Sequence, residues 1–155
     1  MPRRFGIDWD SYLNVFHAER AGMAEDVLSR ASNGYHTPYR WLARAVSARA
    51  EMVLDIACGS GAMSRELHRP GRTVIGVDIS AAELALAQSR GPGPWVRGDA
   101  LRLPIADETV DAVTSSMGMV VVQPTEQLLM ESARVLKPGG MLAFMAPTLR
   151  PLLPG

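Results

Sequence analysis

Cysteine and histidine are scarce in this sequence of 155 residues. The one cysteine, Cys58, excludes an internal disulfide framework. The three histidines, His17, His36 and His68, are too scattered to supply the ligand spacing of a structural zinc site. We therefore expect no bound metal and a reducing, cytoplasmic environment.

Net charge and long apolar runs are also lacking. Sixteen basic residues balance sixteen acidic ones, so no overall field attracts a nucleic acid and small ligands are favoured as partners. No window approaches ~20 consecutive apolar residues, which argues against a transmembrane helix. Arg3 and Arg4 precede Asp8 and Asp10 instead of an apolar segment, so we expect neither an export signal nor a membrane partner.

The amino-terminal third has the periodicity of helices. Apolar residues recur there at helical spacing, which predicts two or three short helices before residue 47. One of them begins at Pro38, with Thr37 as its cap. The same spacing predicts that Tyr12, Phe16 and Trp41 belong to the core.

From Glu51 onward short apolar strands alternate with helices, the pattern of a parallel sheet covered on both faces. Ser80 and Glu83 predict a capping box at the start of the second of these helices. The predicted fold class is α/β, a Rossmann-like doubly wound, mostly parallel sheet with strand order 3-2-1-4-5. The expected organisation is a single domain, with a helical cap over residues 1–50 and the core over residues 51–155. The predicted strands are 52–57, 73–77, 95–96, 110–115 and 141–146, and the helices are 62–68, 81–89 and 125–136.

Carboxylates end three of the predicted strands. The first strand runs through Asp55 into a turn with Gly59 and Gly61, which permit positive φ and a close ligand. Asp78 ends the second strand, where a carboxylate can accept from two ribose hydroxyls. Asp99 ends the third and can accept from a purine amine. Each alone can be an ordinary turn residue, but together they indicate a nucleoside site.

A nicotinamide dinucleotide is the first alternative to test, because it uses the same turn and the same ribose-binding acid. Ser64 stands where the third glycine of that motif would be. Asp55 would also place a negative charge beside a diphosphate at the helix N-terminus. The residues suit a cationic nucleoside better, and S-adenosylmethionine carries both an ammonium and a sulfonium group.

Four motifs stand out along the second part of the chain: Asp55–Gly61, Gly76–Ser80, Gly98–Asp111 and Arg134–Gly140. Together they resemble the motifs of class I S-adenosylmethionine-dependent methyltransferases, most closely the "methyltransferase type 11" branch and its actinobacterial members. The resemblance covers residues 51–147 strongly and the first fifty loosely.

The resemblance implies a role for each site residue. Asp55 would pair with the methionyl amine directly or through water, Asp78 would bind the ribose hydroxyls, and Asp99 with Ala100 would read the adenine edge. Ser116 and Met117 would border the methyl group and the acceptor. The cofactor-binding set implied in this way is Asp55, Ala57, Gly59, Gly61, Asp78, Ile79, Asp99, Ala100, Ser116 and Met117.

Two residues of the turn depart from a simple functional interpretation. Ala57 stands where many members of the family have a glycine, and we expect little loss from so small a side chain. Cys58 is interpreted as a turn residue and not as a nucleophile, because no base adjoins it in the sequence.

Methyl transfer to a small-molecule acceptor by in-line displacement is the predicted activity. A sulfonium methyl is already activated, so holding the acceptor in line supplies roughly 7 to 11 kcal/mol and a base is optional. His36 and Tyr39 are weak candidates for that base, beside His17, Glu19 and Tyr35, and a structural role is the favoured interpretation of each. We expect the cap to cover the cofactor and shape the acceptor pocket.

The carboxyl-terminal end raises a second function. Members of this fold carry two further strands, whereas only residues 147–155 follow the fifth predicted strand, which predicts an exposed sheet edge. A shortened chain, a homo-oligomer and a partner chain that covers the edge are three open explanations. The alternative function is a truncated, catalytically silent nucleoside-binding or interaction domain.

Overall fold

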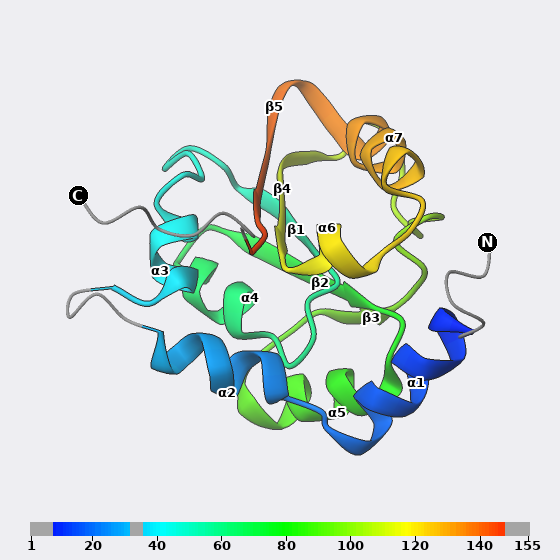
Figure 1. The fold of residues 1–155 in the computed structure, drawn as a ribbon. Coiled ribbons are helices and arrows are strands. Elements are labelled where there is room, and N and C mark those ends of the chain that lie inside the picture. The colour runs from blue at the N-terminus through cyan, green and yellow to red at the C-terminus, as the bar shows by residue number, and fades with distance from the viewer. Residues whose placement is uncertain (1–7, 32–35, 148–155) are drawn as a thin grey trace, which may run out of the picture.

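The computed structural model describes residues 8–31 and 36–147, which form one parallel sheet with helices on both faces (Figure 1). The elements, in chain order, are α1 (Trp9–Glu19), α2 (Met23–Arg30), α3 (Pro38–Ala43), β1 (Met52–Ile56), α4 (Ala62–Leu67), β2 (Thr73–Asp78), α5 (Ala81–Arg90), β3 (Trp95–Arg97), β4 (Val110–Ser116), α6 (Gly118–Val121), α7 (Thr125–Val135) and β5 (Leu136–Met145).

The sheet has the strand order β3-β2-β1-β4-β5, and all neighbouring strands are parallel. The predicted fold class and strand order are therefore confirmed. The order reverses at β1, which pairs with β2 on one side and β4 on the other, so Asp55 lies opposite Gly76 and Thr114. Ligands of such sheets bind beyond the carboxyl ends of the strands at this reversal.

Two hydrophobic layers hold the helices to the sheet. On one face Met63 and Leu67 of α4 pack with α3 and with Val53. On the other face Leu128 and Val135 of α7 pack against strand residues that include Leu54, Ile56, Val77 and Val113. The strand residues alternate between the layers because successive side chains point to opposite faces. Each fully buried aliphatic side chain contributes about 1.5 to 3 kcal/mol.

Polar side chains of the motifs Gly98–Asp111 and Arg134–Gly140 connect neighbouring elements of the fold. Asp111 accepts from the backbone amides of Glu51 and Met52 and from Lys137, at 2.8 to 2.9 Å, and so joins the starts of β1 and β5 to β4. Arg134 donates to Glu131, to Asp107 and to two carbonyls of the loop before β4. Asp111 and Arg134 therefore stabilise the fold and lie away from the carboxyl ends of the strands.

The amino-terminal helices form as expected, but their packing differs from the prediction. Thr37 caps α3, accepting from Arg40 N at 3.3 Å, with Pro38 in the first turn. Tyr12 is 51% exposed and Trp41 65% exposed, so their predicted place in the core is wrong. The physical reason is that α1 and α3 are covered on one side only, which leaves part of each apolar stripe on the surface.

Two elements beyond β4 also differ from the prediction. The apolar run after Met117 contains a short helix, α6, that periodicity did not reveal. β5 begins at Leu136, directly after α7, instead of at residue 141. Among the described residues β5 pairs with β4 alone, and Phe144 on it is 49% exposed, which fits the predicted exposed edge. No helix in residues 8–31 and 36–147 is long and apolar enough to cross a membrane.

Candidate functional site

The residues that follow β1 and β4 have strained backbone. Ala57 after β1 and Met117 after β4 have φ of 52° and 71°, which L-residues with a side chain adopt at a cost of about 1 to 2 kcal/mol. Gly118, the residue after Met117, packs against Ala57, since a Cβ on it would come within 2.8 Å of Ala57 Cβ. Strained non-glycine residues gather at functional sites, and these two flank the point where the strand order reverses.

Asp78, the last residue of β2, holds the glycine-rich turn. Its Oδ2 accepts from Gly59 N at 2.8 Å, and its Oδ1 accepts from Ser80 N at 2.8 Å. Burial raises the pKa of Asp78, while these two amides act in the opposite direction. A carboxylate offers about four acceptor positions, so the two amides leave room for two further donors.

Asp55 lies beneath the turn and is fully buried. Its Oδ2 accepts from Ser64 Oγ at 2.7 Å and its Oδ1 from Thr114 Oγ1 at 2.9 Å. Burial raises the pKa of Asp55 to about 6, although both hydroxyls lower it. Ser64, which occupies the position of the third glycine in the dinucleotide motif, thus donates a hydrogen bond to the buried carboxyl group of Asp55.

Asp99 and Ile79 are placed at the surface of the same strand ends. Asp99 is exposed, and its Oδ1 accepts from Leu101 N at 2.8 Å, which is the geometry of an Asx turn. Ala100 beside it is buried, and Ile79 is 56% exposed after Asp78. The structure thus brings Asp55 and Asp78 together around the turn and leaves Asp99 facing outward at the end of β3.

The two glycines of the turn have different neighbours. A Cβ on Gly61, where φ is 80°, would meet the Trp95 ring at 2.5 Å, so this position requires glycine because of packing. A Cβ on Gly59 would meet only Glu83, at 3.7 Å. Packing against Trp95 therefore accounts for glycine at position 61, whereas at position 59 the backbone φ of 52° is what favours glycine.

Ser116 and Met117 lie at the end of β4, as the sequence predicted. Ser116 Oγ is buried and has no hydrogen-bond partner among the described residues. An unpaired buried hydroxyl is unfavourable unless a ligand or water satisfies it. Cys58 is buried in the turn and burial raises the pKa of its thiol, which agrees with a structural role.

Glu83 does not form the predicted capping box. Ser80 Oγ accepts from Glu83 N at 3.3 Å, but Asp78 takes the Ser80 amide that Glu83 would need. The Glu83 carboxylate instead accepts from Gly22 N at 3.0 Å and contacts His17 Nδ1 at 3.2 Å. Sequence reasoning missed this contact, because its partners lie more than sixty positions away.

A second carboxylate joins α2 to the turn. Glu25 accepts from Ser60 Oγ at 2.5 Å, from Arg90 at 2.7 Å and from Arg65. Burial would raise the pKa of Glu25, but these three donors outweigh it and hold the pKa below its usual value. Arg65 also donates to Ser60 O at 2.7 Å. No local sequence pattern indicates this cluster either.

The weak candidates for a catalytic base, Tyr39 and His36, lie in or next to α3 and not at the ends of the strands. Tyr39 is buried and lines a cavity of ≈ 260 Å³ between α2, α3 and α4, while His36 lies 3.2 Å from Arg44. Burial raises the pKa of Tyr39, which makes it a poor base. Glu19 is exposed, and Tyr35 lies outside the described residues.

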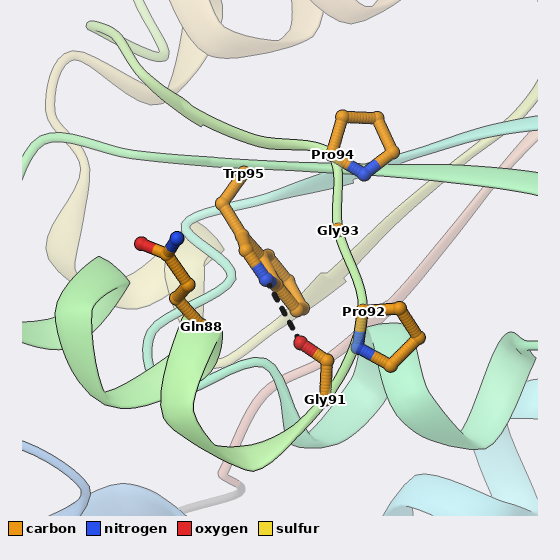
Figure 2. Close-up of a pocket in the computed structure, with 6 residues that line it drawn as sticks. All are labelled: Gln88, Gly91, Pro92, Gly93, Pro94 and Trp95. Carbon is orange, nitrogen blue, oxygen red and sulfur yellow. Dashed lines mark hydrogen bonds between the residues drawn. The ribbon is translucent and has the colours of Figure 1, made fainter.

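A larger hollow of ≈ 430 Å³ lies at the start of β3, lined by Gln88 and residues 91–95 (Figure 2). Trp95 Nε1 donates to Gly91 O there, at 3.2 Å. It opens at the amino end of the strand, whereas Asp55 and Asp78 lie toward the carboxyl ends. We therefore do not associate it with the nucleoside site. No cluster of potential metal ligands occurs in the part of the chain that the structure describes.

Known methyltransferases are similar to this chain in sequence and in fold. A family model described as "Methyltransferase domain" matches residues 54–144. Demethylmenaquinone methyltransferase from Streptomyces avermitilis is 39% identical over 139 residues, covering 86% of this chain and 59% of that protein. A complex of the Haloferax volcanii Trm112 methyltransferase activator with a methyltransferase has a similar chain, with a TM-score of 0.72, 26% identity and coverage of 84% of this chain and 58% of that one.

The fold is thus that of the Rossmann-like methyltransferases. The chain belongs to the class I S-adenosylmethionine-dependent methyltransferases, as the motifs indicated. It spans less than two thirds of the length of the relatives compared above. The [4+2]-cyclase SpnF shares the fold at 19% identity, with a TM-score of 0.70 and coverage of 85% of this chain and 58% of that one, so the fold alone does not define the reaction.

Proposed function

We propose that this chain binds S-adenosylmethionine at the carboxyl ends of β1, β2 and β4 and transfers its methyl group to a small-molecule acceptor. The observation that carries the proposal is the pairing of Asp78 with the glycine-rich turn, through Gly59 N at 2.8 Å. The free acceptor positions of Asp78 suit the two ribose hydroxyls, and exposed Ile79 offers an apolar surface to the adenine.

The remaining site residues divide the work around the cofactor. Since Asp55 is fully buried with both oxygens engaged, we assign it an electrostatic role toward the methionyl ammonium, direct or through a water molecule. Gly59 and Gly61 would line the methionine moiety of the cofactor, and Asp99 and Ala100 would lie beside its adenine. When bound, S-adenosylmethionine supplies a methyl group on a positively charged sulfur.

Ser116 and Met117 would border the acceptor. The unpartnered Ser116 hydroxyl, in the structure as described, is available to orient a polar atom of the acceptor. The relatives named demethylmenaquinone methyltransferases support an acceptor of the demethylmenaquinone type. We assign no residue as a base, because positioning of the acceptor supplies much of the rate on its own.

We further propose that residues 1–50 act as a cap and residues 51–155 as the cofactor-binding core. The ion-pair cluster of Glu25 with Arg65 and Arg90 supports this division, because it joins α2 to α4 and α5 beside the turn. The exposed edge at β5, with Phe144 on it, supports association with a second copy or another chain. A cytoplasmic location agrees with both parts of this proposal.

A catalytically silent nucleoside-binding domain is the second candidate. The chain spans 59% of the length of the Streptomyces avermitilis methyltransferase, so the activity of that whole protein is a proposal here and binding alone is its alternative. The deciding experiment is calorimetric titration with S-adenosylmethionine and S-adenosylhomocysteine, followed by a methyl-transfer assay with demethylmenaquinone. Binding with turnover supports the enzyme, binding without turnover on any acceptor supports the second candidate, and absence of binding contradicts both.

A further inference from the structure

The carboxylate of Glu83 lies between the cap and the glycine-rich turn. The residue is 3% exposed and lies on α5. It accepts from Gly22 N at 3.0 Å and lies 3.2 Å from His17 Nδ1, so both partners come from the cap. Oε2, the oxygen that accepts from Gly22 N, also lies 3.7 Å from where a Cβ on Gly59 would stand. One buried group therefore contacts α1 and the α1–α2 turn and lies close to the turn after β1.

The α1–α2 turn is shaped to reach this carboxylate. Gly22 has φ of 82°, and a Cβ on it would come within 2.7 Å of Leu86 Cδ2 on α5. Glycine alone permits this conformation and this close approach. The backbone amide of Gly22 can thus donate directly to a side chain inside the protein, where an unpaired carboxylate would be very unfavourable.

The charges around His17 favour its protonated form. Among the described residues, Glu83 on α5 and Asp78 at the end of β2 are the charged groups that we find facing it. The hydrogen bond with Glu83 raises the pKa of His17, burial lowers it, and the charges of Glu83 and Asp78 raise it further. In return the His17 cation lowers the pKa of Asp78, whereas Glu83 raises it. Arg90, the nearby cation of α5, is paired with Glu25.

On the basis of the proposed function, we propose that Glu83 is a positioning residue that docks the α1–α2 turn onto the glycine-rich turn, and that protonated His17 strengthens this docking and cofactor affinity with it. Gly59 faces Glu83, and Ser60 is bound by Glu25 of the same helix pair. We therefore expect docking of the cap to favour the conformation of the turn that begins at Ala57.

The direction of the pH dependence follows from linkage. A histidine whose pKa is higher in the docked state stabilises that state below its ordinary pKa of about 6.5, and this contribution disappears as pH rises through the higher value. Cofactor affinity should therefore fall as pH rises above about 6.5. Asp55, with a pKa of about 6, titrates mainly below this range in every variant compared, whereas the pKa of Asp78 responds to the charges of His17 and Glu83.

The test is calorimetric titration of the full chain with S-adenosylhomocysteine at several pH values between about 6.5 and 9, the range that linkage assigns to His17. The wild type should lose about threefold to tenfold in affinity over this range, as expected for a partly buried charge-assisted pair. His17→Gln keeps a donor without a charge, so its affinity should match that of the wild type at high pH and not vary. His68→Gln, at an exposed histidine, is the matched control and should behave as the wild type does.

Glu83→Gln tests the docking itself. It should weaken binding about tenfold near pH 6.5, in line with loss of hydrogen bonds to a charged group, and flatten the pH profile because His17 loses the acid that favours its protonated form. Amide hydrogen exchange around Gly22 should rise in this variant, since the Gly22 amide loses its charged acceptor. If Glu83 served the fold alone, its replacement would lower thermal stability and leave the pH dependence of the affinity unchanged. His17→Gln separates these cases, because His17 is only half-buried and its replacement leaves the core intact.

The two proposals fail in different ways. A pH profile of His17→Gln that matches the wild type, or wild-type affinity in Glu83→Gln, overturns the inference and leaves the proposed function standing. Absence of S-adenosylhomocysteine binding in the wild type at every pH overturns the proposed function, and the cofactor role of Glu83 with it.

Discussion

The backbone amide of Gly59 lies 2.8 Å from Oδ2 of Asp78, so the residue that ends β2 fixes the turn that follows β1. The two strands are neighbours in the sheet, and the contact spans nineteen positions of the sequence. A side chain that both shapes the turn and presents free acceptor positions beside it should affect cofactor binding more than any exposed acid.

The first prediction concerns Asp78. Asp78→Ala should raise the dissociation constant of S-adenosylmethionine by about 10-fold to 150-fold, which corresponds to the ~1.5 to 3 kcal/mol of hydrogen bonds to a charged group. Isothermal titration calorimetry measures the change. Glu126→Gln, at an exposed acid on α7, is the control and should bind as the wild type does. Equal affinity of the Asp78 variant and the control would contradict the assignment.

The second prediction separates stability from affinity at Asp55. Burial raises the pKa of Asp55 to about 6, so the folded state binds a proton more tightly than the unfolded chain. The contribution of Asp55 to the free energy of unfolding should therefore fall as pH rises from about 4 to about 6 and then level off. Asp55→Asn should remove this slope and gain on the order of 2 kcal/mol at neutral pH.

The same Asp55 variant should bind S-adenosylmethionine less tightly, because the ammonium group loses a nearby carboxylate. Urea unfolding at several pH values gives the stability, and calorimetry gives the affinity. A variant that is less stable than the wild type at neutral pH, or that binds equally well, would show that the acid serves the fold alone.

The third prediction concerns the strained turn. Ala57→Gly should raise the free energy of unfolding by about 0.5 to 1 kcal/mol, because a φ of 52° is costly for alanine and not for glycine. The matched control is Ala85→Gly, the same replacement at an exposed site inside α5, which should lower stability by about 0.5 to 1 kcal/mol. Thermal unfolding followed by circular dichroism distinguishes the two, and changes of the same sign would refute the explanation.

The fourth prediction concerns the edge of the sheet. At high concentration the protein should have a mass above the 16.8 kDa of one chain, because β5 offers unpaired backbone groups and exposed Phe144. Phe144→Lys should lower the apparent mass, since lysine on an edge strand opposes pairing. Light scattering measures both. The exposed Met130→Lys on α7 is the control, and a similar loss of mass there would locate the contact elsewhere.

Residues at the carboxyl ends of strands could be placed from the sequence, because strand periodicity and parallel topology bring them to one edge. Asp55 and Asp78 were placed in this way, and the strand order was predicted correctly. The contacts of the Glu83 and Glu25 carboxylates could not be predicted, because their partners lie between 35 and 66 positions away and depend on how the cap packs.

Periodicity also failed where burial was incomplete. Tyr12 and Trp41 repeat at helical spacing but lie on helices that the rest of the chain covers on one side only. The helix α6 lies in an apolar run that has the composition of a strand, and its start depends on the positive φ of Met117. Neither feature has a local signature that propensity alone could separate from the alternative.

The ring of Trp95 lies against Gly61 and Gly76, in contact distance of both. An indole wedged between the glycine-rich turn and the second strand has its environment set by the conformation of that turn. Its fluorescence is therefore a natural optical reporter, able to follow ligand entry in real time without any attached dye.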